Sequence, residues 1–240
     1  MQKTSFSMVR LLVVGLVLAG VAIAVLVMAP RFSQTGETAK PEPVATPDLA
    51  GTRASAERGE AEAQKNLGTI FAKGLGVKQD YKEAARWYRS AADQGHAGAQ
   101  LALGELYEVG QGVPRDEAEA ANWYRRAAEQ GLAGAQYSLA ALYVQGKGVS
   151  ANEAEAMKWY RLAAEQGDAL AQYNLGMRYY EGRGVPPEPA QAYQWLSLAG
   201  AQGIADAART CDALKSRMTR EQLNEGRRRV ESFATKKNAK

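Results

Sequence analysis

One 36-residue unit recurs four times in this chain, and that period constrains the fold more than any other feature. Glycines and glutamines return at the same interval as the tryptophans, which are Trp87, Trp123, Trp159 and Trp195. A fixed period of this length is typical of a solenoid, in which each unit packs against its neighbours. The spacing predicts units over 61–96, 97–132, 133–168 and 169–204.

The second unit shows why each unit should be a helical hairpin. Its first apolar stripe has helical spacing and consists of Ala99, Leu103, Leu106 and Tyr107. The Gly-Gln-Gly-Val-Pro run at 110–114 predicts a turn, and Asp116 is placed to cap a second helix. One hairpin cannot bury its own apolar face, so neighbours must stack. We therefore expect an all-α fold, a right-handed α-solenoid of four helix-turn-helix repeats.

Partial units at both ends of the repeats predict capping helices. Residues 53–60 resemble the end of a second helix, and residues 205–234 restart the pattern and continue as a polar helix. Thr219 and Gln222 have capping-box spacing. A basic tail at 235–240 follows Arg227-Arg228-Arg229. These cations suggest contact with anionic lipid, nucleic acid or an acidic partner, or simply a solvated helix end.

The N-terminal part of the sequence predicts a membrane anchor. After a flank at 1–10, residues 11–29 carry no charge and are long enough for a single transmembrane helix. A cleaved signal peptide is the alternative, but the apolar run continues past its small residues and Pro30 disfavours cleavage after Ala29. The proline-rich segment 30–52 is typical of a disordered linker. Flanking charges weakly favour an inner-membrane protein with periplasmic repeats.

The repeat phrase Ala-x-Ala-Gln-x-x-Leu-Gly-x-x-Tyr-x-x-Gly-x-Gly-Val, followed by Ala-x-x-Trp-Tyr-x-x-Ala-Ala-x-Gln-Gly, resembles the Sel-one-like repeat family, which is related to tetratricopeptide repeats. The resemblance implies an adaptor or scaffold that binds other proteins, often in signalling or bacterial envelope complexes, and no catalytic residues. The fourth unit departs from the phrase at Gly200 and in the Pro186-Pro187-Glu188-Pro189 turn. The lone cysteine also departs from family members with disulfide-paired repeats.

Most catalytic and metal-binding constellations are excluded by composition. The chain has one histidine, His96, and one cysteine, Cys211, which we expect to be a buried apolar filler. Nothing in the sequence pairs with His96, so we expect it at the surface or between repeats. The Gly-x-Gly turns lack the rest of a phosphate loop, and the acidic groups near Asp116 stand where helix caps are favoured. We expect no enzyme activity, cofactor or metal.

The best candidate for a binding site is the face of the first helices opposite their core stripe. In tetratricopeptide-like stacks this face lines a concave groove. Along the chain it changes from polar to aromatic, and we expect a partner-binding groove formed by Leu101, Glu105, Glu108, Tyr137, Tyr173, Met177 and Tyr180. Tyrosine and methionine are typical of adaptable protein-binding surfaces. The alternative is that some of these tyrosines pack between repeats.

These observations predict a membrane-anchored, non-catalytic scaffold that binds a protein or peptide in this groove. A periplasmic module that binds cell-wall glycan or exopolysaccharide is the alternative, because tyrosines also stack on sugars. Nucleic acid is not expected, since residues 57–204 carry fifteen basic and eighteen acidic side chains and present no basic face.

Overall fold

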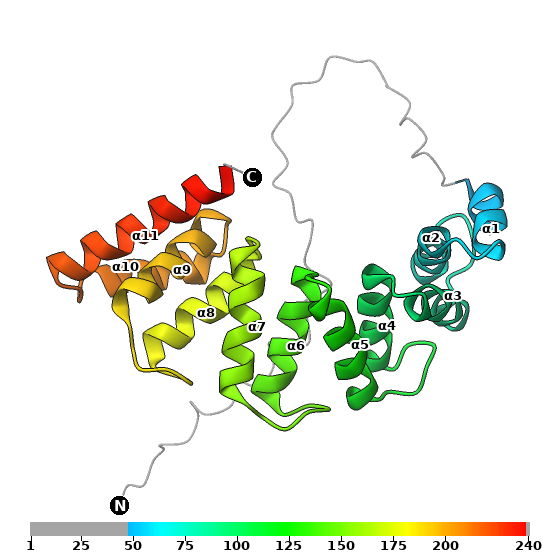
Figure 1. The fold of residues 1–240 in the computed structure, drawn as a ribbon, viewed down its shortest axis with the longest axis horizontal. Coiled ribbons are helices and arrows are strands. Elements are labelled where there is room, and N and C mark those ends of the chain that lie inside the picture. Colours follow the sequence, from blue (N-terminus) through cyan, green and yellow to red (C-terminus); the bar gives the residue numbers. More distant parts are fainter. Residues whose placement is uncertain (1–47, 239–240) are drawn as a thin grey trace, which may run out of the picture. The chain divides into compact units, whose positions relative to one another are not determined.

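The computed structural model describes residues 48–238, and this range contains eleven α-helices and no strands (Figure 1). The helices are α1 (Leu49–Glu57), α2 (Ala61–Lys73), α3 (Tyr81–Asp93), α4 (Ala97–Val109), α5 (Glu117–Glu129), α6 (Ala133–Gln145), α7 (Glu153–Glu165), α8 (Ala169–Glu181), α9 (Pro189–Ala201), α10 (Ala205–Lys215) and α11 (Arg220–Asn238). The expected all-helical class is confirmed.

The helices from α1 to α10 pack in chain order, each against the one before it and the one after it. The hairpins are α2 with α3, α4 with α5, α6 with α7, and α8 with α9. The second helix of each hairpin then packs on the first helix of the next. This stacking of like units is the solenoid that the 36-residue period predicts.

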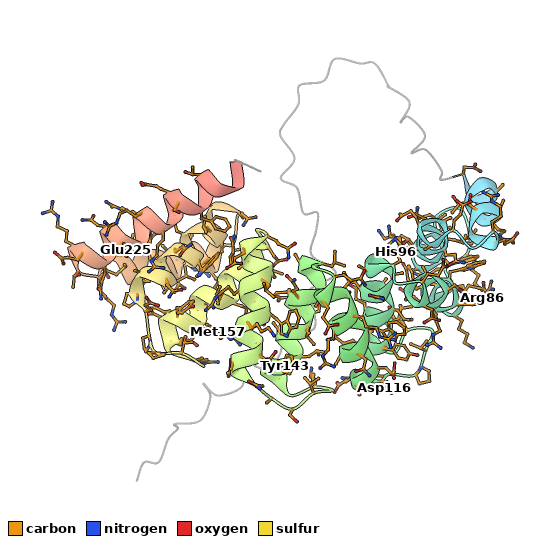
Figure 2. The ribbon with its side chains drawn as sticks, viewed as in Figure 1. Arg86, His96, Asp116, Tyr143, Met157 and Glu225 are labelled. Atoms are coloured by element: carbon orange, nitrogen blue, oxygen red, sulfur yellow. The ribbon has the colours of Figure 1, made fainter. Side chains whose placement is uncertain are left out.

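Helix caps and turn glycines explain the regular hairpin boundaries. The carboxylate of Asp116, labelled at the start of α5 in Figure 2, accepts from the backbone N–H groups of Ala118 and Glu119, both at 3.0 Å. α4 ends at Gly110, whose φ of 81° lies in the left-handed region that favours glycine. Asp116 therefore caps the second helix as predicted.

The terminal helices differ from the prediction in their bounds. The N-terminal partial helix was expected at 53–60 but begins at Leu49, because Asp48 caps it by accepting from the Gly51 N–H at 3.0 Å. Residues 49–52 are therefore helix and not linker. At the other end Thr219 and Gln222 form the predicted capping box, with reciprocal bonds of 3.0 and 3.2 Å. The helix that follows extends past the expected end at 234.

A ladder of buried glutamines joins the units. The side chain of Gln136 donates to the carbonyl of Ala128 in the preceding unit at 3.2 Å and accepts from Gln166 in its own unit at 2.8 Å. The same pair of bonds recurs in every unit, at Gln64, Gln100 and Gln172. Each buried amide is thus satisfied, and the register between neighbouring hairpins is fixed.

Small residues let the paired helices approach closely. A Cβ added at Gly104 would lie 2.6 Å from the ring of Tyr124, which is fully buried between α4 and α5. The tryptophans of the repeat are buried in the core. Cys211 is a free, buried thiol among apolar side chains, and burial raises its pKa, so the prediction of an apolar filler is confirmed.

The last helix departs from the repeat, because α11 packs mainly on α9. Tyr193 of α9 stands where the earlier units have alanine or methionine, and Gly226 of α11 makes room for its ring. Phe233 meets Trp195 edge-on, with ring centroids 5.6 Å apart. α11 therefore covers one side of the fourth repeat.

No helix between residues 48 and 238 is long and apolar enough to cross a membrane. The transmembrane helix predicted at 11–29 lies outside the residues that the structure describes, as does most of the predicted linker.

Candidate interaction surface

The predicted groove residues lie on the first helices α4, α6 and α8, and we call this set the first-helix surface. It consists of Leu101, Glu105 and Glu108 on α4, Tyr137 on α6, and Tyr173, Met177 and Tyr180 on α8. Glu105 is exposed and the other six side chains are half-buried. Half-burial holds each side chain in place and still leaves part of it free for a partner.

The acidic end of this surface is formed by Glu105 and Glu108. The hydroxyl of Tyr124 donates to Glu108 at 2.6 Å and holds that carboxylate in place. Among the described residues, no cation lies within ion-pair distance of either glutamate. Although Glu105 reaches solvent, partial desolvation raises its pKa, and the neighbouring charge of Glu108 raises it further. A cation bound here would relieve that repulsion.

The aromatic end continues over α6 and α8. The Tyr137 ring packs against Tyr160 of α7 with ring centroids 5.7 Å apart, and burial raises the pKa of Tyr137. Part of the Tyr137 side chain is therefore buried by packing within the repeats and is not available to a partner. Tyr173 is less enclosed, and Leu170, one turn earlier on α8, is 47% exposed. Leu170 stands where the second and third units have glycine, so it enlarges the apolar surface in the fourth unit only.

Arg178 is a residue that the sequence reasoning missed. The equivalent positions of the first three units hold Ile70, Leu106 and Leu142, which are all core residues. Arg178 is only 6% exposed, its Nε donates to Glu153 at 3.1 Å, and its guanidinium lies 4.8 Å from the centre of the Tyr160 ring. The signal was present in the sequence, as a break in a column of apolar residues 36 positions apart.

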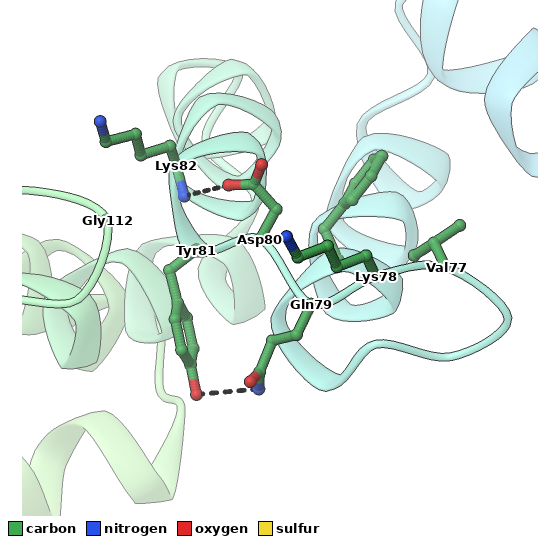
Figure 3. A pocket seen from close by; sticks show the side chains of 8 residues that line it. Val77, Lys78, Gln79, Asp80, Tyr81, Lys82 and Gly112 are labelled. Carbon is green, nitrogen blue, oxygen red and sulfur yellow. Dashed lines mark hydrogen bonds between the residues drawn. The ribbon is translucent and has the colours of Figure 1, made fainter.

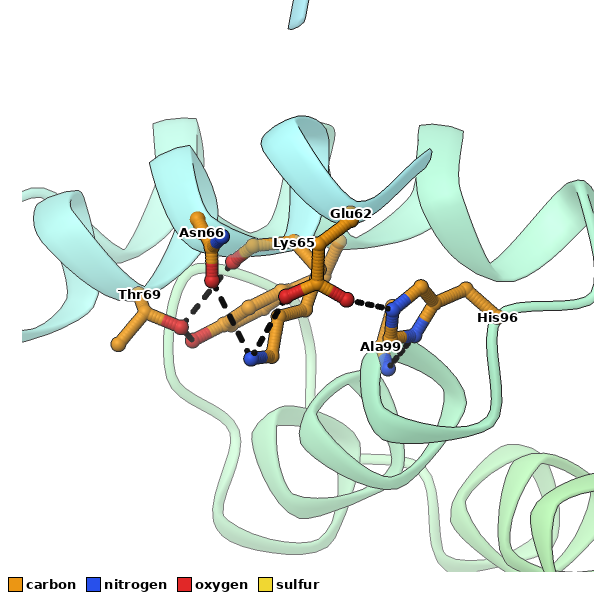
Figure 4. Close-up of polar contacts among 7 residues, drawn as sticks. Glu62, Lys65, Asn66, Thr69, His96 and Ala99 are labelled. Carbon is orange, nitrogen blue, oxygen red and sulfur yellow. Dashed lines mark hydrogen bonds and ion pairs between the residues drawn. The ribbon is translucent and has the colours of Figure 1, made fainter. Parts of the chain in front are cut away.

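The expectation that nothing pairs with His96 was wrong, because its partner lies in the preceding unit (Figure 4). The His96 Nε2 lies 2.7 Å from a Glu62 carboxylate oxygen, and Nδ1 accepts from the Ala99 N–H at 3.2 Å. His96 thus caps α4 and joins it to α2. The hydrogen bond from His96 is the main reason why the pKa of Glu62 is lowered. The expected role between repeats is confirmed.

Other polar clusters in the described part of the chain serve the fold. Residues 48–238 contain no group of three or more histidine, cysteine or acidic residues placed to hold a metal. An open hollow of about 590 Å³ lies beside the turn after α2 (Figure 3). Its Asp80 caps α3 by accepting from the Lys82 N–H at 2.9 Å, and its Gln79 bonds the Tyr81 hydroxyl at 3.1 Å. These polar groups already have partners inside the protein.

Comparison with known proteins identifies the family. A model of the Sel1 repeat matches residues 61–96, 97–132, 133–168 and 169–204. The chain belongs to the Sel1 repeat family. A search of curated proteins found no match. The Sel1 match confirms the resemblance seen in the repeat phrase, and it agrees with the solenoid architecture.

Two solved Sel1-type structures are similar to this chain. A Sel1 repeat protein from Oxalobacter formigenes is 32% identical, with 77% of this chain and 80% of that chain covered and a TM-score of 0.66. The second is c5321, a protective antigen of uropathogenic Escherichia coli with an SLR fold. It is 29% identical over 78% of this chain, with a TM-score of 0.52. The aligned part is 48% of c5321, so this chain corresponds to about half of that protein.

Proposed function

We propose that this Sel1 repeat protein is a non-catalytic scaffold that binds a protein or peptide partner on its first-helix surface. Proteins of the Sel1 family are generally interaction scaffolds, which supports the class of function. The location on α4, α6 and α8 is our inference from the side chains that these helices present.

The observation that carries the proposal is the change in chemistry along this surface. Glu105 and Glu108 form an acidic end that pairs with no cation from residues 48–238, whereas Tyr173, Met177 and Tyr180 form a half-buried aromatic and apolar end. A segment that is basic at one end and apolar at the other complements this order. Aromatic and methionine side chains contribute strongly to protein interfaces, and charge complementarity sets the direction of binding.

The test is capture of the partner by the full chain and by variants of it. The double variant Tyr173→Ala with Tyr180→Ala should lower capture at least tenfold, because it removes two apolar contacts of about 1–2 kcal/mol each. Tyr81→Ala is the matched control, since Tyr81 is also half-buried but lies on α3, away from the surface. Helicity of all variants should equal that of the parent. Capture that survives in the double variant would contradict the proposed site.

We further propose that residues 11–29 anchor the scaffold in the inner membrane and that the repeats are periplasmic. The support is the sequence alone: an uncharged run of nineteen residues between Arg10 and Pro30. C-terminal fusions of alkaline phosphatase and of green fluorescent protein to the full chain test this. Phosphatase activity without fluorescence is expected, and fluorescence without phosphatase activity would reverse the orientation.

A further inference from the structure

A cavity of about 350 Å³ lies at the C-terminal end of the repeats, between the turn after α8 and the short connection from α10 to α11. Its walls include Tyr180, Pro187 and Pro189 from the fourth unit, Leu214 from α10, and Arg217 and Met218 from the connection. Tyr180 also belongs to the first-helix surface, so the cavity adjoins the aromatic end of that surface.

The hollow at the equivalent turn of the first unit has Gly112 of the next turn in its wall, whereas the cavity at this end has the short last connection in its wall. In the preceding units a turn glycine lies against the first residue of the preceding second helix: a Cβ at Gly112 would overlap the Tyr81 carbonyl, and one at Gly148 would overlap that of Glu117. Pro189 is the equivalent first residue of α9. The residue that would cover it, 36 positions after Gly184, is Arg220, which is already in α11.

Arg217 is the charged residue of the cavity wall, and it is exposed. Among the described residues no carboxylate lies within ion-pair distance of it. Its Nη1 makes only a long bond of 3.5 Å to the Tyr180 hydroxyl. Three acids close to the cavity residues in sequence have partners of their own: Glu181 pairs with Arg183 at 2.6 Å, Asp212 pairs with Lys215 at 2.8 Å, and Glu188 accepts from the side chain of Gln191. The guanidinium is therefore available to an external anion.

We propose that this cavity binds the C-terminal residue of a peptide partner, with an apolar side chain between the prolines and Met218 and the carboxylate on Arg217. The volume is at the lower end of the range for ligand sites and suits a single large side chain. A guanidinium binds a carboxylate with two parallel hydrogen bonds, which a neutral amide cannot reproduce. The inference rests on the proposed peptide-binding function and names the chemistry recognised at one end of the surface.

The test uses the full chain labelled with [methyl-¹³C]methionine, with the Met218 signal assigned from a Met218→Leu variant. N-acetyl-phenylalanine should shift that signal saturably. N-acetyl-phenylalaninamide, which lacks the carboxylate, should bind about tenfold more weakly, and N-acetyl-glycine, which lacks the side chain, should not bind. Arg217→Gln should lower the affinity for N-acetyl-phenylalanine to that for the amide. Arg228→Gln, whose arginine pairs with Glu225 at 2.9 Å on α11, is the matched control and should leave binding unchanged.

An unshifted Met218 signal, or equal binding of acid and amide, would overturn the inference. Acetyl-Asp-Phe-amide distinguishes the source of the carboxylate, because it carries one only on a side chain. Binding of this compound as tight as that of the acid would contradict recognition of a C-terminus. The proposed function has a separate test, which does not depend on the binding of these small compounds. It would be contradicted if the Tyr173 and Tyr180 double variant still captured the partner.

Discussion

Arg178 of α8 and Glu153 of α7 form an ion pair of 3.1 Å, although the earlier units have an apolar residue at the position of the arginine. The arginine side chain is 7% exposed and the glutamate 39%. The pair thus joins α7 to α8 across the boundary of the third and fourth units. Burial of a charge costs desolvation energy, so we expect the pair to add little net stability compared with an apolar residue at this position.

Replacement of Arg178 by leucine restores the residue of the earlier units. We expect the melting temperature of Arg178→Leu to equal or exceed that of the parent, because an apolar side chain replaces a desolvated charge. Glu153→Gln leaves the buried guanidinium without its charged partner and should destabilise the repeats by about 1–2 kcal/mol. Thermal unfolding followed by circular dichroism measures both. Equal losses in the two variants would contradict this interpretation.

The glutamine ladder predicts unequal effects for its two members. Gln136→Ala should destabilise by about 2–3 kcal/mol, because it removes a buried amide that joins Ala128 to Gln166. Gln166→Ala should cost about 1 kcal/mol or less, since its side chain is exposed and water can replace it. Urea unfolding of both variants checks the order, and a larger loss in Gln166→Ala would contradict it.

A comparison of alanine substitutions at Gly112 and Gly76 distinguishes the cost of close packing from the cost of backbone strain. Both have a positive φ, 70° and 73°, so alanine at either position incurs about 1 kcal/mol of strain. A Cβ at Gly112 would also overlap the Tyr81 backbone, whereas nothing lies within 4 Å of one at Gly76. Gly112→Ala should therefore destabilise by about 1–3 kcal/mol more than Gly76→Ala. Similar melting temperatures would show that the turn does not pack tightly on α3.

The raised pKa of Glu105 predicts that its charge opposes folding. The folded protein holds this proton more tightly than the unfolded chain, so stability should fall as pH rises from the ordinary glutamate range through the folded pKa. Glu105→Gln should remove this contribution and raise stability at neutral pH by less than about 1 kcal/mol, because the group is exposed. Glu129→Gln, on the exposed face of α5, is the control. Unfolding measured from pH 4 to pH 7 shows whether the slope changes.

The sequence was sufficient for the fold because the repeat supplies four independent copies of each signal. Asp116 and Gly110 mark helix ends in the same register as their equivalents. Contacts that occur once were harder to predict. The pair between His96 and Glu62 crosses a unit boundary and has no equivalent in the other units, and α1 starts early because Asp48, at the end of a proline-rich segment, caps it.

Exposure along the candidate surface was only partly predictable. Periodicity placed Tyr137 and Tyr173 on the same face of their helices. It could not show that Tyr137 packs against the ring of Tyr160 whereas Tyr173 is less enclosed, because that depends on the neighbouring helices. One wall of the cavity beside Tyr180 is formed by the short last connection, which no repeat signal encodes.

The central claim is that a partner binds the first-helix surface, and site-specific photo-crosslinking of the full chain in cells tests it most directly. A photoreactive phenylalanine at Met177 lies on this surface, and one at Ala118 lies on the exposed side of α5. We expect a discrete crosslinked partner at Met177, which Tyr173→Ala abolishes, and none at Ala118. Crosslinks at Ala118 alone, or equal crosslinks at both positions, would contradict it.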